Sequence, residues 1–571
     1  MGLFLLDYGA GNVQSLANSL KKLGHDFQWI QEPEDFHKAT SLVFPGVGAF
    51  HAAIDHLDSR GLLKPLREYI DSGKPYFGIC IGMQVLFESS AESPGVRGLG
   101  CIPCSIDSFS NQDKSVPHMG WNSIEFLDIE DPVHHEGMDP SSHYYFVHSY
   151  RAKYDPSNQE AAQWAHATTQ YGQEVFTASV RRGNVFGTQF HPEKSGLAGL
   201  KILDTWLRKS EDARAYAPTT HRRSPREPKP KDGLTKRIVA CMDVRANDEG
   251  DLVVTKGDQY DVREKTVPTS SSSTPTDVSI QAKTAGAVRN LGKPVSLASQ
   301  YFSSGADELC LLNITSFRHS PLLDQPMLAV VRAAAECVFV PLTIGGGIKD
   351  TIDPDGTKRS ALEVAGAYFR AGADKVSIGS EAVYAVEKML ASESGEGDGT
   401  SAIETIAKPY GRQAVVVSID PRRVYIDNPT NYDGPYQDEL VFGKPSGLER
   451  ERGKAWWYQC TVSGGRENRP LSVVQLAKGV EKLGAGEILL NSIDRDGTGL
   501  GFDLDLVNLV KKSVRIPVVA SSGAGKAEHF VQVFEGTGVE AALAAGIFHR
   551  GEVGIEDVKE ALKAAGINAR E

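Results

Sequence analysis

Cysteine is scarce in this sequence, and long apolar runs and an excess of basic charge are absent. Seven cysteines in 571 residues, at irregular spacings, exclude a disulfide framework and fit a reducing compartment. No apolar run approaches the ~18 residues that a membrane span needs. Lys and Arg total 61 against 73 Asp and Glu, a formal charge of −12, so nucleic acid is not an expected partner. We therefore expect a soluble, cytoplasmic protein without a membrane partner.

The alternation of apolar runs with helical stretches divides the chain into two α/β domains. Residues 1–208 have the pattern of an α/β domain with a mostly parallel sheet. Residues 209–235 are rich in proline and charge and predict an extended linker. Residues 236–571 contain eight apolar runs, each followed by a helical stretch, which predicts a (β/α)8 (TIM) barrel. Polar insertions, which we expect to be mobile loops, lie near 263–280, 391–402 and 421–455.

An internal repeat within residues 236–571 supports the barrel. Asp243, at the end of the first predicted strand, corresponds to Asp420 at the end of the fifth, about 177 residues later. Asn313 and Asn491 follow the same interval within one residue. Two half-barrels that face each other would place Asp243 and Asp420 on opposite sides of one active site.

The first candidate for chemistry is Cys80. It lies in a Gly-Ile-Cys-Ile-Gly turn between an apolar strand and a helical stretch, which is the pattern of a nucleophile elbow. A helix N-terminus favours the thiolate. The period-two spacing of His191 and Glu193 lets both emerge from one side of an extended segment, as a base and its orienting carboxylate. The alternative is that Cys80 is a buried structural cysteine.

These residues resemble the class I glutamine amidotransferases, whose triad has the same three residue types in the same order. The segments from Lys114 to Asn122 and from Tyr144 to Tyr150 resemble the branch that serves histidine biosynthesis. His118 and His148 lie in these segments, and a structural role is as open for them as a functional one. The resemblance implies an oxyanion segment and a glutamine-binding set, formed by Gly46, Val47 and Gly48 and by Gln84, Ser149 and Tyr150 respectively.

Small-residue turns follow the predicted barrel strands in both halves. Such turns expose backbone N–H groups to phosphate, so the duplicated arrangement predicts a substrate with a phosphate at each end. Between them, Asp243 and Asp420 could act as proton donor and acceptor, or could merely cap the turns that follow. The turn residues are Gly346, Gly347, Gly379 and Ser380 in the first half and Ser522, Gly523, Ala545 and Gly546 in the second.

The barrel is similar to the cyclase subunit of the imidazole glycerol phosphate synthase family, over nearly everything except the linker and the insertions. The resemblance implies that ammonia from glutamine attacks the formimino-linked ribulosyl phosphate PRFAR, giving imidazole glycerol phosphate and AICAR. Asp243 and Asp420 would be the acid–base pair, with Lys256 and Asp496 in support. Asn313 and Ser522 depart from relatives that carry aspartate and glycine there. No metal or cofactor is expected, and the Cys101–Cys104 spacing is interpreted as two ordinary thiols.

The same resemblance implies a dry route for ammonia between the two sites. Four charged residues at the beginnings of predicted strands would form a ring around its entrance: Arg237, Glu308, Lys375 and Glu487. Lys194 and Asp374 would pair across the docked domains. For the ring the alternative is an ordinary solvated rim. We hypothesise that PRFAR binding acts on the segment at Val47 and Gly48, so that glutamine is hydrolysed when both substrates are present.

Three other functions fit these residues less well. A pyridoxal phosphate synthase would need imine-forming lysines at the strand ends, where this chain has aspartates. A sugar-phosphate isomerase of the same pathway would not need a glutaminase. A non-enzymatic scaffold that senses a phosphometabolite would be expected to lose Cys80, His191 or Glu193. We expect both activities on one chain, as a monomer.

Overall fold

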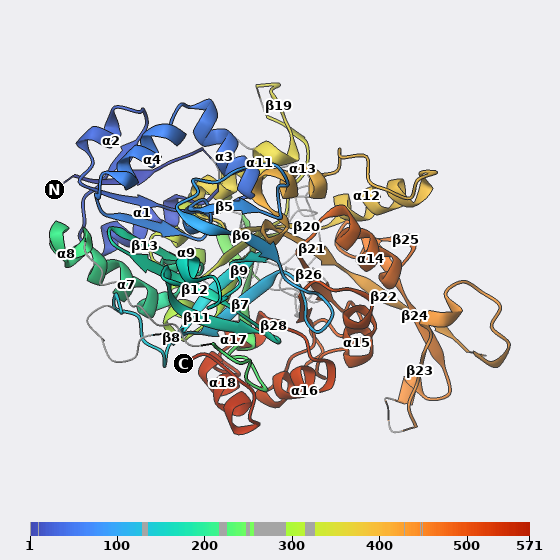
Figure 1. Cartoon of the computed structure of the whole chain (residues 1–571). Helices are drawn as coiled ribbons and strands as arrows, with labels where there is room; N and C mark the ends of the chain where they lie inside the picture. Colours follow the sequence, from blue (N-terminus) through green and yellow to red (C-terminus); the bar gives the residue numbers. More distant parts are fainter. Residues whose placement is uncertain are drawn as a thin grey trace, which may run out of the picture.

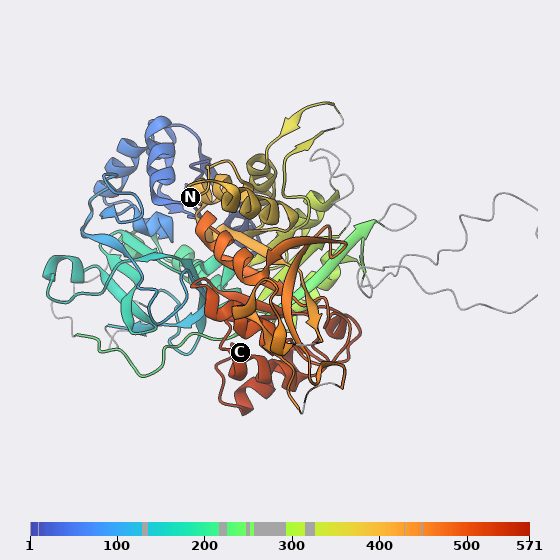
Figure 2. The ribbon, with the colours of Figure 1, turned by 90° about the vertical axis from the view of Figure 1, so that its right-hand side faces the viewer.

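The computed structural model of the chain has two domains that pack side by side (Figure 1, Figure 2). The structure describes residues 2–9, 11–127, 135–215, 225–246, 252–255, 293–314, 326–353, 355–427, 429–445, 447 and 449–571. Among these residues, no helix is long and apolar enough to cross a membrane.

The N-terminal domain is built on an eight-stranded sheet in the order β2-β1-β3-β4-β13-β12-β11-β8. The five strands from β2 to β13 are parallel, and the last three are antiparallel. Their bounds are β1 Leu3–Leu6, β2 Gln28–Ile30, β3 Ser41–Phe44, β4 Tyr76–Ile79, β8 Glu125–Phe126, β11 Ala165–Tyr171, β12 Glu174–Arg182 and β13 Val185–Thr188. The predicted α/β class is therefore confirmed, and a mixed sheet is its particular form.

Helices cover both faces of this sheet because its central strands are buried on both sides. Alternate residues of β1 and β3 pack with α3 and α4 on one face and with α1 and α7 on the other. The helices are α1 Gln14–Lys22, α2 Asp35–Lys38, α3 Phe50–Ser59, α4 Leu63–Asp71, α5 Ile81–Gln84, α6 Gln159–Ala162 and α7 Gly196–Arg208. A three-stranded sheet and a two-stranded antiparallel sheet complete the domain. The first contains β5 Phe87–Ser90, β6 Ile102–Ser108 and β10 Tyr150–Arg151, and the second contains β7 His118–Ser123 and β9 His143–His148.

The C-terminal domain is a closed barrel of eight parallel strands, which confirms the sequence prediction. Strand β28 pairs with β14 and closes the sheet. The strands are β14 Arg237–Ala246, β16 Glu308–Asn313, β17 Leu342–Gly345, β20 Lys375–Ile378, β21 Val415–Ile419, β26 Glu487–Asn491, β27 Val518–Ser521 and β28 Ala541–Ala544. The surrounding helices are α9 Pro294–Ser303, α10 Pro326–Ala335, α11 Ala361–Ala371, α12 Ser380–Ala391, α13 Ala402–Tyr410, α14 Val473–Leu483, α15 Leu504–Ser513, α16 Ala527–Thr537, α17 Gly546–His549 and α18 Ile555–Ala564.

The insertions differ from one another. Residues 421–455, predicted as a loop, instead contribute to an antiparallel sheet that projects from the barrel away from the N-terminal domain (Figure 1). The prediction of a loop is wrong here because partners distant in the chain supply the pairing. The sheet contains β22 Pro421–Ile426, β23 Val441–Phe442, β24 Ala455–Val462 and β25 Glu467–Ser472. Residues 392–401 connect α12 to α13, and the insertion at 263–280 lies outside the described residues.

Three shorter elements accompany the barrel. Strand β15 Leu252–Thr255 runs antiparallel to the end of β14, and β18 Thr351–Ile352 pairs with β19 Lys358–Arg359. The described part of the predicted linker contains one helix, α8 Glu211–Ala215. It then follows the N-terminal domain, where Lys229 N–H donates to Gln170 Oε1 and Thr235 N–H donates to the Trp121 carbonyl at 2.7 and 2.9 Å.

The N-terminal domain docks on the end of the barrel at which the strands begin. Trp121 Nε1 donates to the carbonyl of Asp307, one residue before β16, at 3.0 Å. The N–H of Gly196 donates to the Phe339 carbonyl before β17 at 2.9 Å. Asp243 and Asp420 lie toward the opposite end, in the last part of β14 and directly after β21. The barrel core therefore separates the docked domain from the candidate cyclase site.

Candidate functional site

Cys80 lies in the strand-to-helix turn that its motif predicts. It follows β4 and precedes α5, with a positive φ of 50° that side chains rarely adopt. The turn needs its glycines, because a Cβ at Gly78 would lie 2.3 Å from the Gly82 carbonyl oxygen. The N–H of Cys80 donates to the Thr188 carbonyl at 2.7 Å. The backbone therefore holds the thiol at the end of β4, next to β13.

His191 and Glu193 complete the arrangement. His191 Nδ1 lies 2.8 Å from Glu193 Oε1, and both side chains are buried. Burial alone would lower the pKa of His191, but the charges of Glu193 and Cys80 and the hydrogen bonds to both raise it well above its usual value. A protonated imidazole beside the sulfur favours the thiolate.

The predicted oxyanion segment lies between this turn and the barrel. A Cβ at Gly46 would lie 2.4 Å from the Ile79 carbonyl, so the segment passes close to the nucleophile turn. The Tyr8 hydroxyl donates to the Val47 carbonyl. The N–H of Ala49 donates to the carbonyl of Pro409, in α13 of the barrel, at 3.1 Å. Gly48 has φ +146° between these two attachments.

The predicted glutamine-binding residues lie near Cys80. Gln84 Nε2 donates to the Tyr150 carbonyl at 3.2 Å, and Gln84 is buried. Ser149 Oγ is buried without a hydrogen-bond partner among the described residues, which suits a hydroxyl that awaits a ligand. Sequence reasoning missed Glu92, a partly buried carboxylate that accepts from the Phe50 N–H at 2.8 Å. Its charge raises the pKa of Tyr150, after the larger effect of burial. No spacing in the sequence singles it out.

At the other end of the barrel, a cavity of about 300 Å³ brings together candidates from several strands. Asp243 and Asp496 both line it. Asn491 Nδ2 donates to Asp420 Oδ1 at 2.7 Å. Burial raises the pKa of Asp420, and the charge of Asp496 raises it further against the hydrogen bond from Asn491. Asp420 is therefore biased toward its protonated form.

The duplicated turns have matching backbones. Gly346 and Ser522, which follow the repeat interval, have φ of +90° and +73°, and the next residues, Gly347 and Gly523, have +80° and +95°. Gly379 and Ala545 are also equivalent, because they are the N-cap residues of α12 and α17. The second set of turns lines a cavity of about 330 Å³ together with Asp496. Its lining includes Ser522, Gly523, Ala545 and Gly546.

Two arginines of the inserted sheet also face the first cavity. Arg422 and Arg466 line it, beside Gly464 and Gly465. Arg422 Nη2 donates to the Gly465 carbonyl at 2.9 Å, which ties β22 to the β24–β25 turn. Sequence reasoning assigned Arg422 to a loop and therefore missed it. The candidate Lys256 lies outside the described residues.

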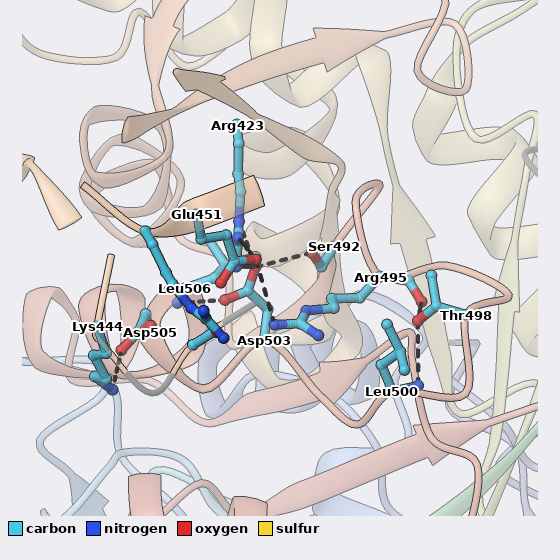
Figure 3. A network of polar contacts seen from close by, with 12 residues as sticks. Arg423, Lys444, Glu451, Ser492, Arg495, Thr498, Leu500, Asp503, Asp505 and Leu506 are labelled. Atoms are coloured by element: carbon cyan, nitrogen blue, oxygen red, sulfur yellow. Dashed lines mark hydrogen bonds and ion pairs between the residues drawn. The ribbon is translucent and has the colours of Figure 1, made fainter. Parts of the chain in front are cut away.

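A buried guanidinium attaches the inserted sheet to the segment that carries Asp496 (Figure 3). Arg423 donates to Glu451 at 2.6 Å and to Asp503 at 2.7 Å, and it stacks 4.3 Å from the Trp456 ring. Ser492 Oγ also donates to Asp503, at 3.3 Å. Asp420 directly precedes β22, which carries Arg423, and Asp496 lies in the segment that leads to Asp503. The network therefore fixes the positions of these two segments relative to each other.

The four predicted ring residues meet at the docked end of the barrel. Arg237 donates to Glu308 at 2.7 Å and to Glu487, while Lys375 Nζ lies 2.6 Å from each of the same two carboxylates. All four are almost fully buried. Although burial would raise the pKa of Glu487, Arg237 and Lys375 hold it below its usual value. The ring is a closed ion-pair cluster at the domain interface, and the alternative of a solvated rim is wrong.

Removing one cation from this ring should destabilise the protein. Lys375→Met leaves Arg237 as the one cation that pairs with Glu308 and Glu487 among the described residues, which costs about 3 kcal/mol. We expect a lower urea midpoint for the variant. The matched control Lys482→Met removes an exposed pair with Glu396 and should cost less than about 1 kcal/mol. Equal midpoints for the two variants would contradict this account of the ring.

The interface connects the ring to the cysteine site. Lys194 Nζ lies 2.8 Å from Asp374 Oδ2, as the predicted interdomain pair requires. The N–H of His191 donates to the Tyr145 carbonyl at 2.9 Å. Burial raises the pKa of the Tyr145 hydroxyl, and the negative charge of Glu308 raises it further. The hydroxyl therefore lies close to the ring. No group of three or more His, Cys, Asp or Glu that could hold a metal occurs in the described part of the chain.

Two family models match the chain. The model described as class I glutamine amidotransferase matches residues 4–209, and the model described as histidine biosynthesis protein matches residues 237–554. The first range contains the cysteine, histidine and glutamate cluster, and the second contains the barrel with its paired turns. Fold and sites thus define a glutamine amidotransferase joined to a barrel enzyme of histidine biosynthesis.

Full-length relatives have the same two-part organisation. The chain is 51% identical to imidazole glycerol phosphate synthase hisHF of Emericella nidulans, over 99% of this chain and 98% of the relative. It is 51% identical to the hisHF enzyme of Schizosaccharomyces pombe, over 98% of each, and 50% identical to the chloroplastic enzyme of Arabidopsis thaliana, over 99% of this chain and 89% of the relative. The chain therefore belongs to the imidazole glycerol phosphate synthase family, as a bifunctional amidotransferase and cyclase.

Proposed function

We propose that glutamine is hydrolysed at Cys80 and that the ammonia passes through the barrel to PRFAR, which it converts to imidazole glycerol phosphate and AICAR. One observation carries the link between the two reactions. The carbonyl of Tyr145 accepts a hydrogen bond from the N–H of His191. The buried hydroxyl of the same tyrosine lies beside the charged ring at the docked end of the barrel. This contact supports a cysteine site that opens toward the docked end of the barrel.

In the glutaminase reaction, the Cys80 thiolate attacks the side-chain amide carbon of glutamine. The protonated His191, oriented by Glu193, gives its proton to the leaving ammonia and then activates water for hydrolysis of the thioester. The segment Gly46–Gly48 supplies N–H groups to the tetrahedral oxyanion. Gln84, Ser149 and Tyr150 hold the substrate, and Glu92 is placed to pair with its α-ammonium group.

The route of ammonia passes the ring and the barrel interior. Arg237, Glu308, Lys375 and Glu487 form the gate, and the pair of Lys194 and Asp374 keeps the domains aligned over it. Beyond the gate, the interior is lined by small and apolar side chains, including Val239, Val416, Leu489, Val519 and Ala541. A dry passage keeps ammonia neutral and concentrated, as the next step requires.

In the cyclase reaction, Asp420 and Asp243 act as proton donor and acceptor. The raised pKa of Asp420 suits the donor, which protonates the group that leaves as water or amine. Asp243 accepts protons from the attacking nitrogen, and Asp496 and Lys256 support the pair. The turns at Gly346, Gly347, Gly379 and Ser380 bind one phosphate of PRFAR, and those at Ser522, Gly523, Ala545 and Gly546 bind the other.

The hydrogen bond from Ala49 to Pro409 provides a physical connection between the barrel and the oxyanion segment. We expect PRFAR to raise the glutaminase rate by at least tenfold, which corresponds to a fall of about 1.4 kcal/mol in the activation free energy. The rate is measured as glutamate release from the full chain, with and without PRFAR. An unchanged rate would refute the coupling.

The alternatives fit the site less well. A pyridoxal phosphate synthase would need a lysine at the strand ends, but aspartates line the described mouth of the barrel. A sensing scaffold would not need the buried pairing of His191 with Glu193. The cytoplasmic location and the monomeric state stay predictions, and the Arabidopsis relative is named chloroplastic.

A further inference from the structure

A single backbone carbonyl near Cys80 determines the direction of two chains of hydrogen bonds. The carbonyl oxygen of Tyr150 lies 2.7 Å from His148 Nδ1 and 3.2 Å from Gln84 Nε2. Because a carbonyl oxygen can accept but never donate, both nitrogens must carry the hydrogen. This assignment follows from chemistry and does not depend on the observed positions of hydrogens.

The first chain leads to the catalytic sulfur. Gln84 Nε2 donates its second hydrogen to Gln189 Oε1 at 3.0 Å. The amide oxygen of Gln189 therefore faces Gln84, and its nitrogen faces Cys80 Sγ at 3.5 Å. If the amide of Gln189 were reversed, its nitrogen would face the Gln84 nitrogen and its oxygen would face the Cys80 sulfur. Water could not solvate either group, because Gln189 is fully buried, so the reversed orientation is unfavourable.

The second chain passes through two histidines that burial keeps neutral. His148 donates from Nδ1, so its Nε2 accepts from His118 Nδ1 at 3.3 Å, and His118 Nε2 accepts from Asn122 Nδ2 at 3.2 Å. Burial lowers the pKa of His148 to about 3 and lowers that of His118 well below its usual value. Asn122 completes the chain by donating to the Gln170 carbonyl at 2.8 Å. His118 and His148 are therefore structural members of a hydrogen-bond network.

Gln189 and His191 both reach the sulfur from the segment that directly follows β13. Phe190 between them is buried in the core. The segment thus offers Cys80 an amide N–H as well as the imidazole. Other titratable groups that face Cys80 are Tyr8, whose pKa burial raises, and Glu193 behind His191.

We propose that Gln189 is a positioning residue of the glutaminase reaction, whose amide N–H holds the Cys80 sulfur as an aligned thiolate. A neutral donor strengthens its hydrogen bond when the acceptor becomes charged, so it favours the anion without competing with His191 for the proton. The Gln84–Tyr150–His148–His118 network has the role of fixing the orientation of this amide. The inference rests on the proposed glutaminase activity of Cys80.

Two variants of Gln189 test the proposal in the full chain. Gln189→Met removes the donor while retaining length and apolar contacts. Gln189→Glu retains the shape and the acceptor toward Gln84 but turns an oxygen toward the sulfur. The pH dependence of Cys80 alkylation by iodoacetamide reports the thiolate directly, and glutamate release with PRFAR present reports kcat and KM.

We expect the midpoint of the alkylation profile to rise by about one pH unit for Gln189→Met and by more for Gln189→Glu. The kcat for glutamine should fall by about 10- to 100-fold, with a smaller change in KM. Gln173→Met, on an exposed glutamine, should leave the profile and kcat unchanged. Cyclisation with ammonium salt should continue in all three variants and reports the intact fold.

An unchanged alkylation midpoint in Gln189→Glu would overturn the proposal, even if kcat fell, because that result would indicate packing alone. If Gln189→Met failed to fold, the isosteric Gln189→Glu would still decide. Absence of glutaminase activity in the unaltered chain would instead refute the proposed function, so the two failures can be told apart.

Discussion

Replacing Cys80 with alanine should abolish cyclisation with glutamine and leave cyclisation with ammonium salt intact. The thiolate is the nucleophile, and no other cysteine lies beside His191 in the described structure, so the glutamine-dependent rate should fall by at least about 10⁴-fold. Ammonia supplied at high pH bypasses the first site and reaches the barrel from solution. Formation of imidazole glycerol phosphate, measured with each nitrogen source, separates the two cases.

A matched variant excludes a general effect of losing a thiol. Cys104 lies in β6, outside the cluster around His191, and burial raises the pKa of its thiol, which makes it a poor nucleophile. Cys104→Ala should keep both activities. If Cys80→Ala retained glutamine-dependent cyclisation, another group would have to release the ammonia.

The sequence predicted the barrel well because its strands are short, buried and separated by helices. The run from Val415 to Ile419 is recognisable since nearly every side chain is apolar, as a strand covered by helices requires. The inserted sheet was missed for the opposite reason. Its register depends on pairings such as Pro421 with Cys460, 39 residues apart, which no local pattern encodes.

The residues of the candidate site differ in the same way in how far the sequence could predict them. Cys80, His191 and Glu193 could be proposed from spacing, because each lies in a short motif that determines its local backbone. Glu92 and Arg422 have no such motif, and only the folded chain brings Glu92 close to Tyr150 and Arg422 to the cavity beside Asp243. The role proposed for Gln189 depends on the direction of hydrogen bonds through residues far apart in the sequence.

Asp243→Asn should abolish cyclisation with either nitrogen source, because asparagine keeps the shape of the side chain but cannot accept a proton. General acid–base catalysis contributes about 10²–10⁴-fold, so we expect a fall of about 10³-fold in imidazole glycerol phosphate formation. The two sets of phosphate-binding turns are untouched, and PRFAR should still raise the glutaminase rate of the variant. The exposed Asp438→Asn should retain both activities. Full activity of Asp243→Asn with ammonium salt would show that the proton acceptor is another of the carboxylates around this cavity, with Asp496 the next to test.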